Sequence, residues 1–339
     1  MPSPLIKHIG VLLALASYLS ASNEASQILK SNLLPDISNL FSIQKNISGL
    51  NSEPVVISNP SSCIIPFVRA GNLILIKAKV DTVEGNFILD TGAPNLVLNM
   101  TYFRNYPSIN NSSDQEQGGV TGSVAAVNPT SIDSLSFGAV KYFKMDADRI
   151  NLGHIENSKG VKILGLLGTK LFKQFELIID YEKSLIYLHL IIKKESAIYK
   201  SDMLKDTSTY TTVPIEMVED KIVAHGEMGG KKLRFVIDSG AESNVLDSRL
   251  PNKIFENVDI TGSVLLSGSS NTKIEALSGA MKNLKIGTQN LSNLPVLITN
   301  LEKMCFSYNY CLDGMLGFDF LSLHKVGFNF VNRKMYIWK

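Results

Sequence analysis

The chain has 339 residues, of which 45% are hydrophobic and 19% are charged, so it can form two or three compact units with substantial cores. Its 33 Lys and Arg residues nearly balance 31 Asp and Glu residues, and no cluster of basic residues marks a nucleic-acid surface. The five His residues are scattered and the three Cys residues form no Cys-x-x-Cys pair. We therefore expect no nucleic-acid partner, no metal and no other cofactor.

The N-terminus has the pattern of a secretory signal peptide. Lys7 precedes an apolar run of eleven residues, 9–19, which is followed by the small residues Ser20, Ala21 and Ser22. This run is too short for a membrane-spanning helix, which needs about 20 residues. We predict a signal peptide at 1–22, cleaved after Ser22 or Ala21, and export of the protein to the periplasm or the medium. Residues 23–61 are predicted to be an N-terminal extension.

An internal repeat organises the remainder. Residues 86–93 read Asn-Phe-Ile-Leu-Asp-Thr-Gly-Ala, and 148 positions later residues 234–241 read Arg-Phe-Val-Ile-Asp-Ser-Gly-Ala. Downstream, Gly165-Leu-Leu-Gly168 recurs as Gly314-Met-Leu-Gly317, which gives Asp-to-Gly spacings of 75 and 76. Such small slippage indicates a duplicated domain. We predict an N-terminal lobe at 62–192, a polar linker at 193–212 and a C-terminal lobe at 213–339.

Both copies have the pattern of β-structure. Residues 73–80 and 222–228 are rich in β-branched residues with partial alternation, and each run is followed by turn residues and then by the strand before the Asp. Helix is expected only at Thr169–Phe175 and Phe318–Leu323. Cys305 and Cys311 could close a small disulfide ring that leaves Cys63 unpaired, or all three thiols could be free.

The repeated Asp lies where a carboxylate needs hydrogen bonds. Each Asp follows three apolar residues and precedes a hydroxyl residue and a glycine, which can supply local hydrogen bonds and a tight turn. If a two-fold relation brings the copies together, Asp90 and Asp238 face each other and share one proton. One carboxylate can then act as a general base and the other as a general acid on either side of a bound water.

These residues resemble the aspartic proteases of the pepsin and retroviral types. The apolar-apolar-Asp-Thr/Ser-Gly-Ala element is similar to their catalytic loop, and residues 163–172 and 313–321 are similar to their apolar-apolar-Gly loop with its short helix. The resemblance covers residues 64–190 and 213–339. It implies an all-β, two-lobed acid-protease β-barrel fold with short helices. Alanine at positions 93 and 241 is the retroviral choice, so the chain resembles the tandem retropepsin-like lobes of bacterial secreted homologues.

By this resemblance, each site residue has a role. The implied catalytic dyad is Asp90 and Asp238; the supporting residues are Thr91 and Ser239, whose hydroxyls lock the loops, Gly92 and Gly240 in the turns, and Gly165 and Gly314 in the loops beneath. Segments 118–123 and 267–271 fit the flaps of this family by position alone, and the sequence departs from the family because neither contains the Tyr of a pepsin flap. The implied activity is aspartic-type endopeptidase cleavage of peptide or protein substrates by a monomer.

Two other functions compete with this interpretation. A serine peptidase could be inferred from Asp238-Ser239-Gly240, but a Gly does not precede the Asp and a Gly-x-Ser-x-Gly elbow is absent. Alternatively, the chain is a weakly active or inactive two-lobed peptide-binding protein on the same fold, because fold does not fix function. A binding module does not need two carboxylates that each keep a hydroxyl residue and a glycine, so the sequence favours the enzyme.

Overall fold

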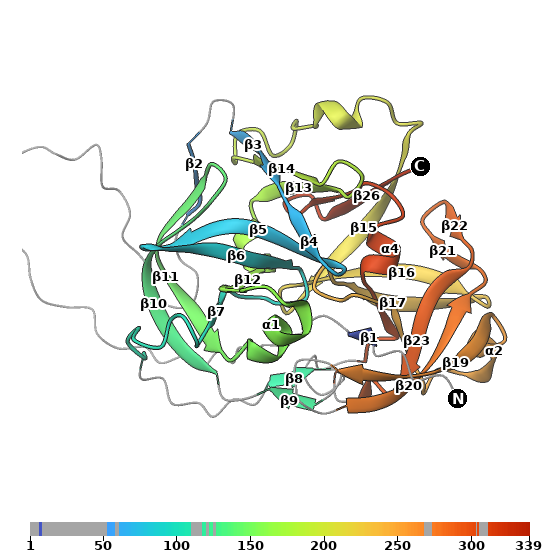
Figure 1. Ribbon diagram of the computed structural model, residues 1–339. Coiled ribbons are helices and arrows are strands. Elements are labelled where there is room, and N and C mark those ends of the chain that lie inside the picture. The colour runs from blue at the N-terminus through green and yellow to red at the C-terminus, as the bar shows by residue number, and fades with distance from the viewer. Residues whose placement is uncertain are drawn as a thin grey trace, which may run out of the picture.

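The computed structural model describes residues 7–8, 53–57, 61–109, 117–119, 122–124, 127–267, 273–302, 304 and 311–339 (Figure 1). Most of the predicted signal peptide and of the predicted N-terminal extension lies outside these residues, so both stay predictions. Among the described residues, no helix is both long and apolar enough to cross a membrane.

The N-terminal lobe is a β-barrel. Its strands are β2 (Val55–Val56), β4 (Val68–Ala70), β5 (Leu73–Val80), β6 (Val83–Asp90), β7 (Val97–Asn99), β10 (Asn128–Phe137), β11 (Val140–Ile150) and β12 (Gly165–Gly168). The strand order is β10-β11-β7-β12-β6-β5, and β10 also pairs with β5, which closes the barrel. In β5, the first four residues are all buried, after which exposed lysines alternate with buried residues. The all-β prediction is confirmed.

The C-terminal lobe repeats this connectivity around its own Asp-containing strand. Its strands are β16 (Lys221–Met228), β17 (Lys231–Ile237), β18 (Val245–Asp247), β19 (Val258–Ser267), β20 (Lys273–Met281), β21 (Leu284–Ile286), β22 (Gln289–Leu291), β23 (Leu294–Thr299) and β24 (Gly314–Leu316). The parallel pair of β24 with β17 corresponds to that of β12 with β6. Likewise β18 lies parallel to β23 and antiparallel to β24, as β7 does to β11 and β12. A short strand, β1 (Lys7–His8), pairs with β19.

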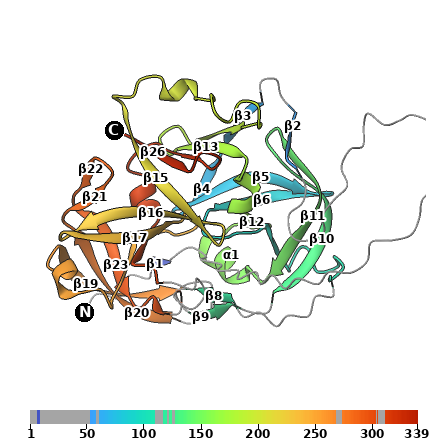
Figure 2. The ribbon, with the colours of Figure 1, turned by 180° about the vertical axis from the view of Figure 1, so that it is seen from behind.

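A sheet built from both lobes joins them. Its strands are β3 (Ser62–Pro66), β13 (Phe175–Asp180), β14 (Leu185–Leu190), β15 (Tyr210–Val218), β25 (Val326–Asn329) and β26 (Lys334–Trp338). The order β15-β26-β25-β13-β14-β3 places three strands of each lobe side by side, with β13 against β25 at the boundary. We call it the interlobe sheet; it lies at the top of Figures 1 and 2.

Two hairpins lie on the opposite side of the molecule from the interlobe sheet. The first is β8 (Gln117–Gly119) with β9 (Gly122–Val124), and the second is β19 with β20. Both views show β8 and β9 beside β20 at the bottom (Figures 1 and 2). The predicted flap at 118–123 therefore falls in a hairpin. Most of the predicted flap at 267–271 lies outside the described residues, between β19 and β20.

The helix prediction was incomplete. Short helical turns occur at the expected places, as η1 (Thr169–Phe172), a 3-10 turn, and α4 (Phe318–Leu321), but α1 (Gly153–Lys159) and α2 (Asn252–Phe255) were not foreseen. In α1 the only buried residue is Ile155, so no apolar periodicity marks the helix. The predicted linker contains η2 (Asp202–Leu204), and its last three residues, 210–212, belong to β15.

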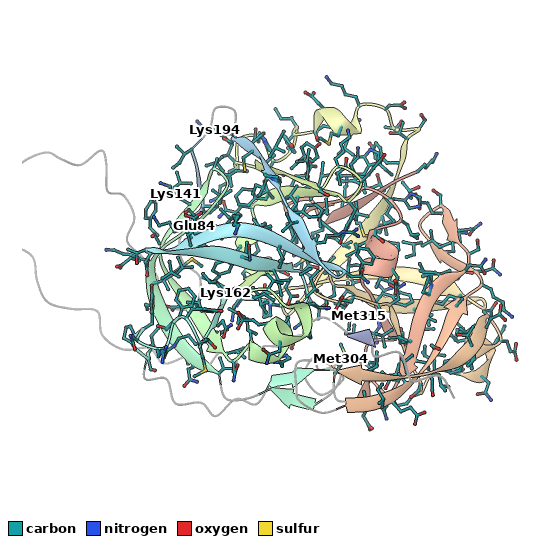
Figure 3. The ribbon with its side chains drawn as sticks, in the orientation of Figure 1. Glu84, Lys141, Lys162, Lys194, Met304 and Met315 are labelled. Carbon is teal, nitrogen blue, oxygen red and sulfur yellow. The ribbon has the colours of Figure 1, made fainter. Side chains whose placement is uncertain are left out.

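An apolar cluster in the core of the C-terminal lobe includes Met304 and Met315, which are both 0% exposed (Figure 3). Cys63 is a free thiol and Cys311 is disulfide-bonded, whereas Cys305 lies outside the described residues.

Candidate active site

Two equivalent strands deliver the two repeated aspartates. Asp90 is the last residue of β6, and Asp238 directly follows β17. Both carboxylates are fully buried, at 0% exposure. Burial of a carboxylate costs free energy unless the group is hydrogen-bonded.

Backbone amides hold one oxygen of each carboxylate. The N–H groups of Gly92 and Ala93 donate to Asp90 Oδ1 at 2.9 and 3.0 Å, and the N–H of Gly240 donates to Asp238 Oδ1 at 2.7 Å. The second oxygen of each, Oδ2, is buried and has no hydrogen-bond partner. Backbone amides therefore fix each carboxylate through one oxygen.

The two turns press against each other. A Cβ atom on Gly92 would lie 2.5 Å from Asp238 Cγ, and a Cβ atom on Gly240 would lie 2.6 Å from Asp90 Cγ. Real Cβ atoms do not approach other atoms so closely, so only glycine allows each loop to reach the opposite carboxylate. The structure thus brings Asp90 and Asp238 together with both glycines.

The hydroxyl residues bind across the lobe boundary. Thr91 Oγ1 donates to the Ile237 carbonyl at 2.9 Å, and Ser239 Oγ donates to the Leu89 carbonyl at 2.8 Å. Each hydroxyl also accepts a hydrogen bond from the main-chain N–H of the other residue. Both hydroxyls are consequently engaged with the opposite loop.

The other two predicted glycines lie beside the dyad strands and do not touch the carboxylates. Gly165 pairs with Phe87 and Gly314 with Phe235, each three residues before the Asp. A Cβ at Gly165 would lie 2.0 Å from the Val97 carbonyl oxygen, so this glycine permits close strand packing. Gly168, which ends the same repeated motif and pairs with Asp90 itself, was not assigned a role in the site from the sequence.

Electrostatics favour a proton on the pair. Burial, and next the negative charge of Asp238, raise the pKa of Asp90 well above its usual value. Burial raises the pKa of Asp238 to about 6, although its amide hydrogen bonds and the positive charge of Lys221 act in the opposite direction. Two neighbouring carboxylates in a buried site cannot both ionise easily, so they retain one proton at mildly acidic pH.

Lys221 is a site residue that the sequence did not reveal. It begins β16, is 1% exposed, and lies close enough to both aspartates for their charges to act on it. Burial lowers its pKa to about 8, while the charges of Glu219, Asp238 and other carboxylates oppose this shift. The only feature of the sequence that could have identified Lys221 is its position at the start of an apolar run.

Glu242 was also missed. It follows the turn after Asp238 and pairs with Lys159 of α1, and both side chains are less than 10% exposed. Its Oε2 accepts a hydrogen bond from the N–H of Asn72 at 3.1 Å, in the turn between β4 and β5. Glu242 therefore connects the Asp238 loop to two elements of the N-terminal lobe. The feature of the sequence that could have identified Glu242 is its charge directly after Asp-Ser-Gly-Ala.

The described residues hold no group of three or more His, Cys, Asp or Glu side chains that could bind a metal ion.

Comparison with known proteins bears on the C-terminal lobe. Residues 224–320 match the model of an aspartyl protease family. The matched segment contains Asp238, Ser239, Gly240 and Gly314. No curated protein matches the chain. The family match supports a general aspartic protease function.

Proposed function

We propose that the protein is an aspartic endopeptidase in which Asp90 and Asp238 activate a water for peptide-bond hydrolysis. One observation carries this proposal. Two fully buried carboxylates, one from each lobe, are held by equivalent turns, and each turn packs against the opposite carboxylate. An ordinary Asx turn explains a single such loop, whereas it does not explain why two of them meet.

The proposed mechanism needs only the dyad and the water. The ionised carboxylate takes a proton from the water, whose oxygen attacks the peptide carbonyl carbon, while the protonated carboxylate gives its proton to the carbonyl oxygen. As the tetrahedral intermediate collapses and the C–N bond breaks, the carboxyl group that took the water proton gives it to the leaving amine nitrogen. The other carboxylate takes a proton from a hydroxyl of the intermediate as the C=O bond of the product acid forms, which restores the singly protonated dyad. The Oδ2 atoms of the dyad support this role, because within the described residues no group outside the pair forms a hydrogen bond with them.

The environments of the two carboxylates suggest which is the base. Lys221 favours the ionised form of Asp238, and the charge of Asp238 favours the protonated form of Asp90. We therefore assign the base to Asp238 and the acid to Asp90 at the start of the reaction. The pair titrates as a unit, so this assignment describes its favoured arrangement.

A single chain provides both halves of the proposed site, so we propose that the active protease is a monomer. Its substrates would be peptides or proteins, and no cofactor enters the mechanism. We also propose that the protein is exported, on the strength of its N-terminal sequence alone.

Digestion of a peptide library tests the proposal. Wild-type protein should cleave the library, whereas D90N and D238N should each lose more than about a hundred-fold in rate, because neither carboxylate works without the other. D259N is a matched control, since Asp259 is exposed on β19. S239A should lose much less than either dyad variant, and an equal loss would favour the serine peptidase.

Two outcomes would contradict the proposal. One is a dyad variant that retains a tenth or more of the wild-type rate. The other is wild-type protein that binds a pepstatin column but cleaves no peptide, which would favour the two-lobed binding protein.

A further inference from the structure

A cavity lies beside the interlobe sheet, on the side of the molecule away from the hairpins. It has a volume of about 430 Å³, within the range of small-molecule sites. Strands β3, β13 and β14 form one wall and residues 199–203 form the other. The residues used below are lining residues Glu176, Tyr187, His189, Tyr199 and Lys200.

Glu176 presents a buried carboxylate to this cavity. The residue is only 2% exposed. Its Oε1 accepts a hydrogen bond from the Tyr199 hydroxyl at 3.2 Å, and its Oε2 accepts one from the Asn329 amide at 3.5 Å. Both donors are neutral. Within the described part of the chain, no Lys, Arg or His nitrogen forms an ion pair with Glu176.

The cross-strand neighbour of Glu176 is engaged with other partners. His189 lies directly opposite Glu176 in the β13–β14 pair. However, its Nδ1 is hydrogen-bonded to Ser62 Oγ at 2.6 Å, and its Nε2 lies 3.2 Å from Glu195 Oε1. Its ring also stacks on Tyr199, with ring centroids 4.0 Å apart. The imidazole is thus held away from Glu176 by its own partners.

The burial of Glu176 has an electrostatic cost. A buried carboxylate normally has a cationic partner, because hydrogen bonds from neutral groups offset only part of the lost hydration. Burial raises the pKa of Glu176, despite the hydrogen bonds from Tyr199, Asn329 and Ser201, which are all neutral and act against the shift. The negative charge of Glu176 also contributes to the raised pKa values of Tyr199 and Tyr336. A cation in the cavity would relieve this cost.

The lining suits one kind of cation. The aromatic rings of Tyr187 and Tyr199 line the cavity, and aromatic faces attract alkylammonium groups through their negative potential. A metal ion is usually held by several His, Cys, Asp or Glu side chains, and no group of three or more of these that could hold one occurs in the described residues. A carboxylate beside aromatic rings favours an organic ammonium ion instead.

We propose that this cavity binds an alkylammonium group, with the Glu176 carboxylate as its counter-ion and the rings of Tyr187 and Tyr199 as its walls. The group could be a free quaternary ammonium compound or a trimethylated lysine side chain of a polypeptide, since the recognised trimethylammonium group is the same. This site does not depend on the proposed protease activity.

Calorimetric titration of the full chain tests the site. The probes are choline, its neutral analogue 3,3-dimethylbutan-1-ol, and a short peptide that contains trimethyl-lysine. Choline or the peptide should bind at least ten-fold more tightly than the neutral analogue. The stronger of the two cationic probes identifies the source of the ammonium group as free or peptide-borne.

Variants separate the cavity from general electrostatics. E176Q should weaken binding of the cationic probe at least ten-fold, whereas E182Q, which removes an exposed carboxylate elsewhere, should leave it unchanged. K200Q should leave binding equal or stronger, because it removes a positive charge from the lining. Near-ultraviolet circular dichroism checks folding, and Y187L provides a second test if E176Q does not fold.

Three results would overturn the proposal. They are no heat of binding with either cationic probe at millimolar concentration, equal binding of choline and its neutral analogue, and equal binding to the wild type and E176Q. If Y187L replaces E176Q in the test, unchanged binding to Y187L would likewise overturn it.

Discussion

Thr91 and Ser239 form a reciprocal pair across the lobe boundary. The Thr91 N–H donates to Ser239 Oγ at 3.1 Å, and the Ser239 N–H donates to Thr91 Oγ1 at 2.9 Å. Each hydroxyl then donates to a carbonyl of the opposite strand. Two loops that are 148 residues apart are thereby locked in one relative position, which fixes the spacing of the two carboxylates.

Replacement of Thr91 by valine should therefore destabilise the protein. T91V removes the hydroxyl and leaves the buried Ser239 N–H and Ile237 carbonyl without their partner, at a cost of about 1–3 kcal/mol in the free energy of unfolding. Urea unfolding measures this loss. T91S retains the hydroxyl and should recover most of it. A T91V midpoint equal to that of the wild type would show that this pair does not hold the lobes together.

The glycines of the two turns should be intolerant of any side chain. G92A and G240A each place a methyl group within 2.6 Å of the opposite Asp Cγ, so the carboxylates must move apart. We expect each variant to lose at least a hundred-fold in peptidase rate, because small misplacements of reacting groups have large effects.

Gly262 provides the matched control for this pair. A Cβ atom there would meet only Ser278 Oγ, at an ordinary 3.6 Å. G262A should retain wild-type activity in the same assay. Wild-type rates for G92A or G240A would contradict the close approach of the loops.

The dyad loops were predictable from sequence because their chemistry is local. Asp-Thr-Gly-Ala and Asp-Ser-Gly-Ala encode the turn, its hydroxyl and its close approach within four residues. The strand at 73–80 was predicted with its correct limits, because β-branched residues and an alternating second half mark it. The repeat register predicted that residues 165–168 and 314–317 are equivalent, but as loops, whereas Gly165 and Gly314 begin the short strands β12 and β24.

Other features depend on contacts between distant segments. The interlobe sheet places three strands of the N-terminal lobe beside three strands of the C-terminal lobe, and no local pattern predicts that β13 pairs with β25. Lys221 and Glu242 are charged residues in buried positions, which sequence patterns assign to the surface. Their roles arise only when the lobes meet. Helix α1 lacks an apolar stripe, so its existence follows from its packing and its Gly160 C-cap.

The ion pair between Lys159 and Glu242 should contribute to both stability and rate. E242L leaves the nearly buried Lys159 cation without its partner, which should cost about 3 kcal/mol in the free energy of unfolding. Because Glu242 follows the Asp238 turn, the peptidase rate should also fall. Urea unfolding and peptide cleavage measure the two effects.

A double variant and a surface variant complete this test. K159M with E242L removes both charges and should recover much of the stability, because no buried charge remains unpaired. D259N breaks an exposed pair with Lys282 and should change stability by less than about 0.5 kcal/mol. Equal stability of E242L and D259N would mean that the pair is not effectively buried.

The rate of peptide cleavage should have its optimum in the mildly acidic to near-neutral range, above that of gastric pepsins. The reaction requires one proton on the dyad. As pH falls through the pKa of Asp238, which is raised to about 6, the base becomes protonated and the rate decreases. As pH rises through the raised pKa of Asp90, the acid loses its proton and the rate decreases again. Because both pKa values are raised, the pH range in which the enzyme is active lies higher than for an ordinary pair of carboxylates.

Ala93 and Ala241 provide a way to test the cause. Both are fully buried beside the dyad, and neither can offer a side-chain hydrogen bond to an ionised carboxylate. A serine hydroxyl at each position could donate such a bond, which favours the charged form and lowers its pKa. The double variant A93S/A241S should therefore shift the profile of kcat/KM against pH toward acid. A wild-type optimum below about pH 3 would contradict the raised pKa values. If the folded double variant has the same pH profile as the wild type, the two alanines do not cause the raised pKa values of the dyad.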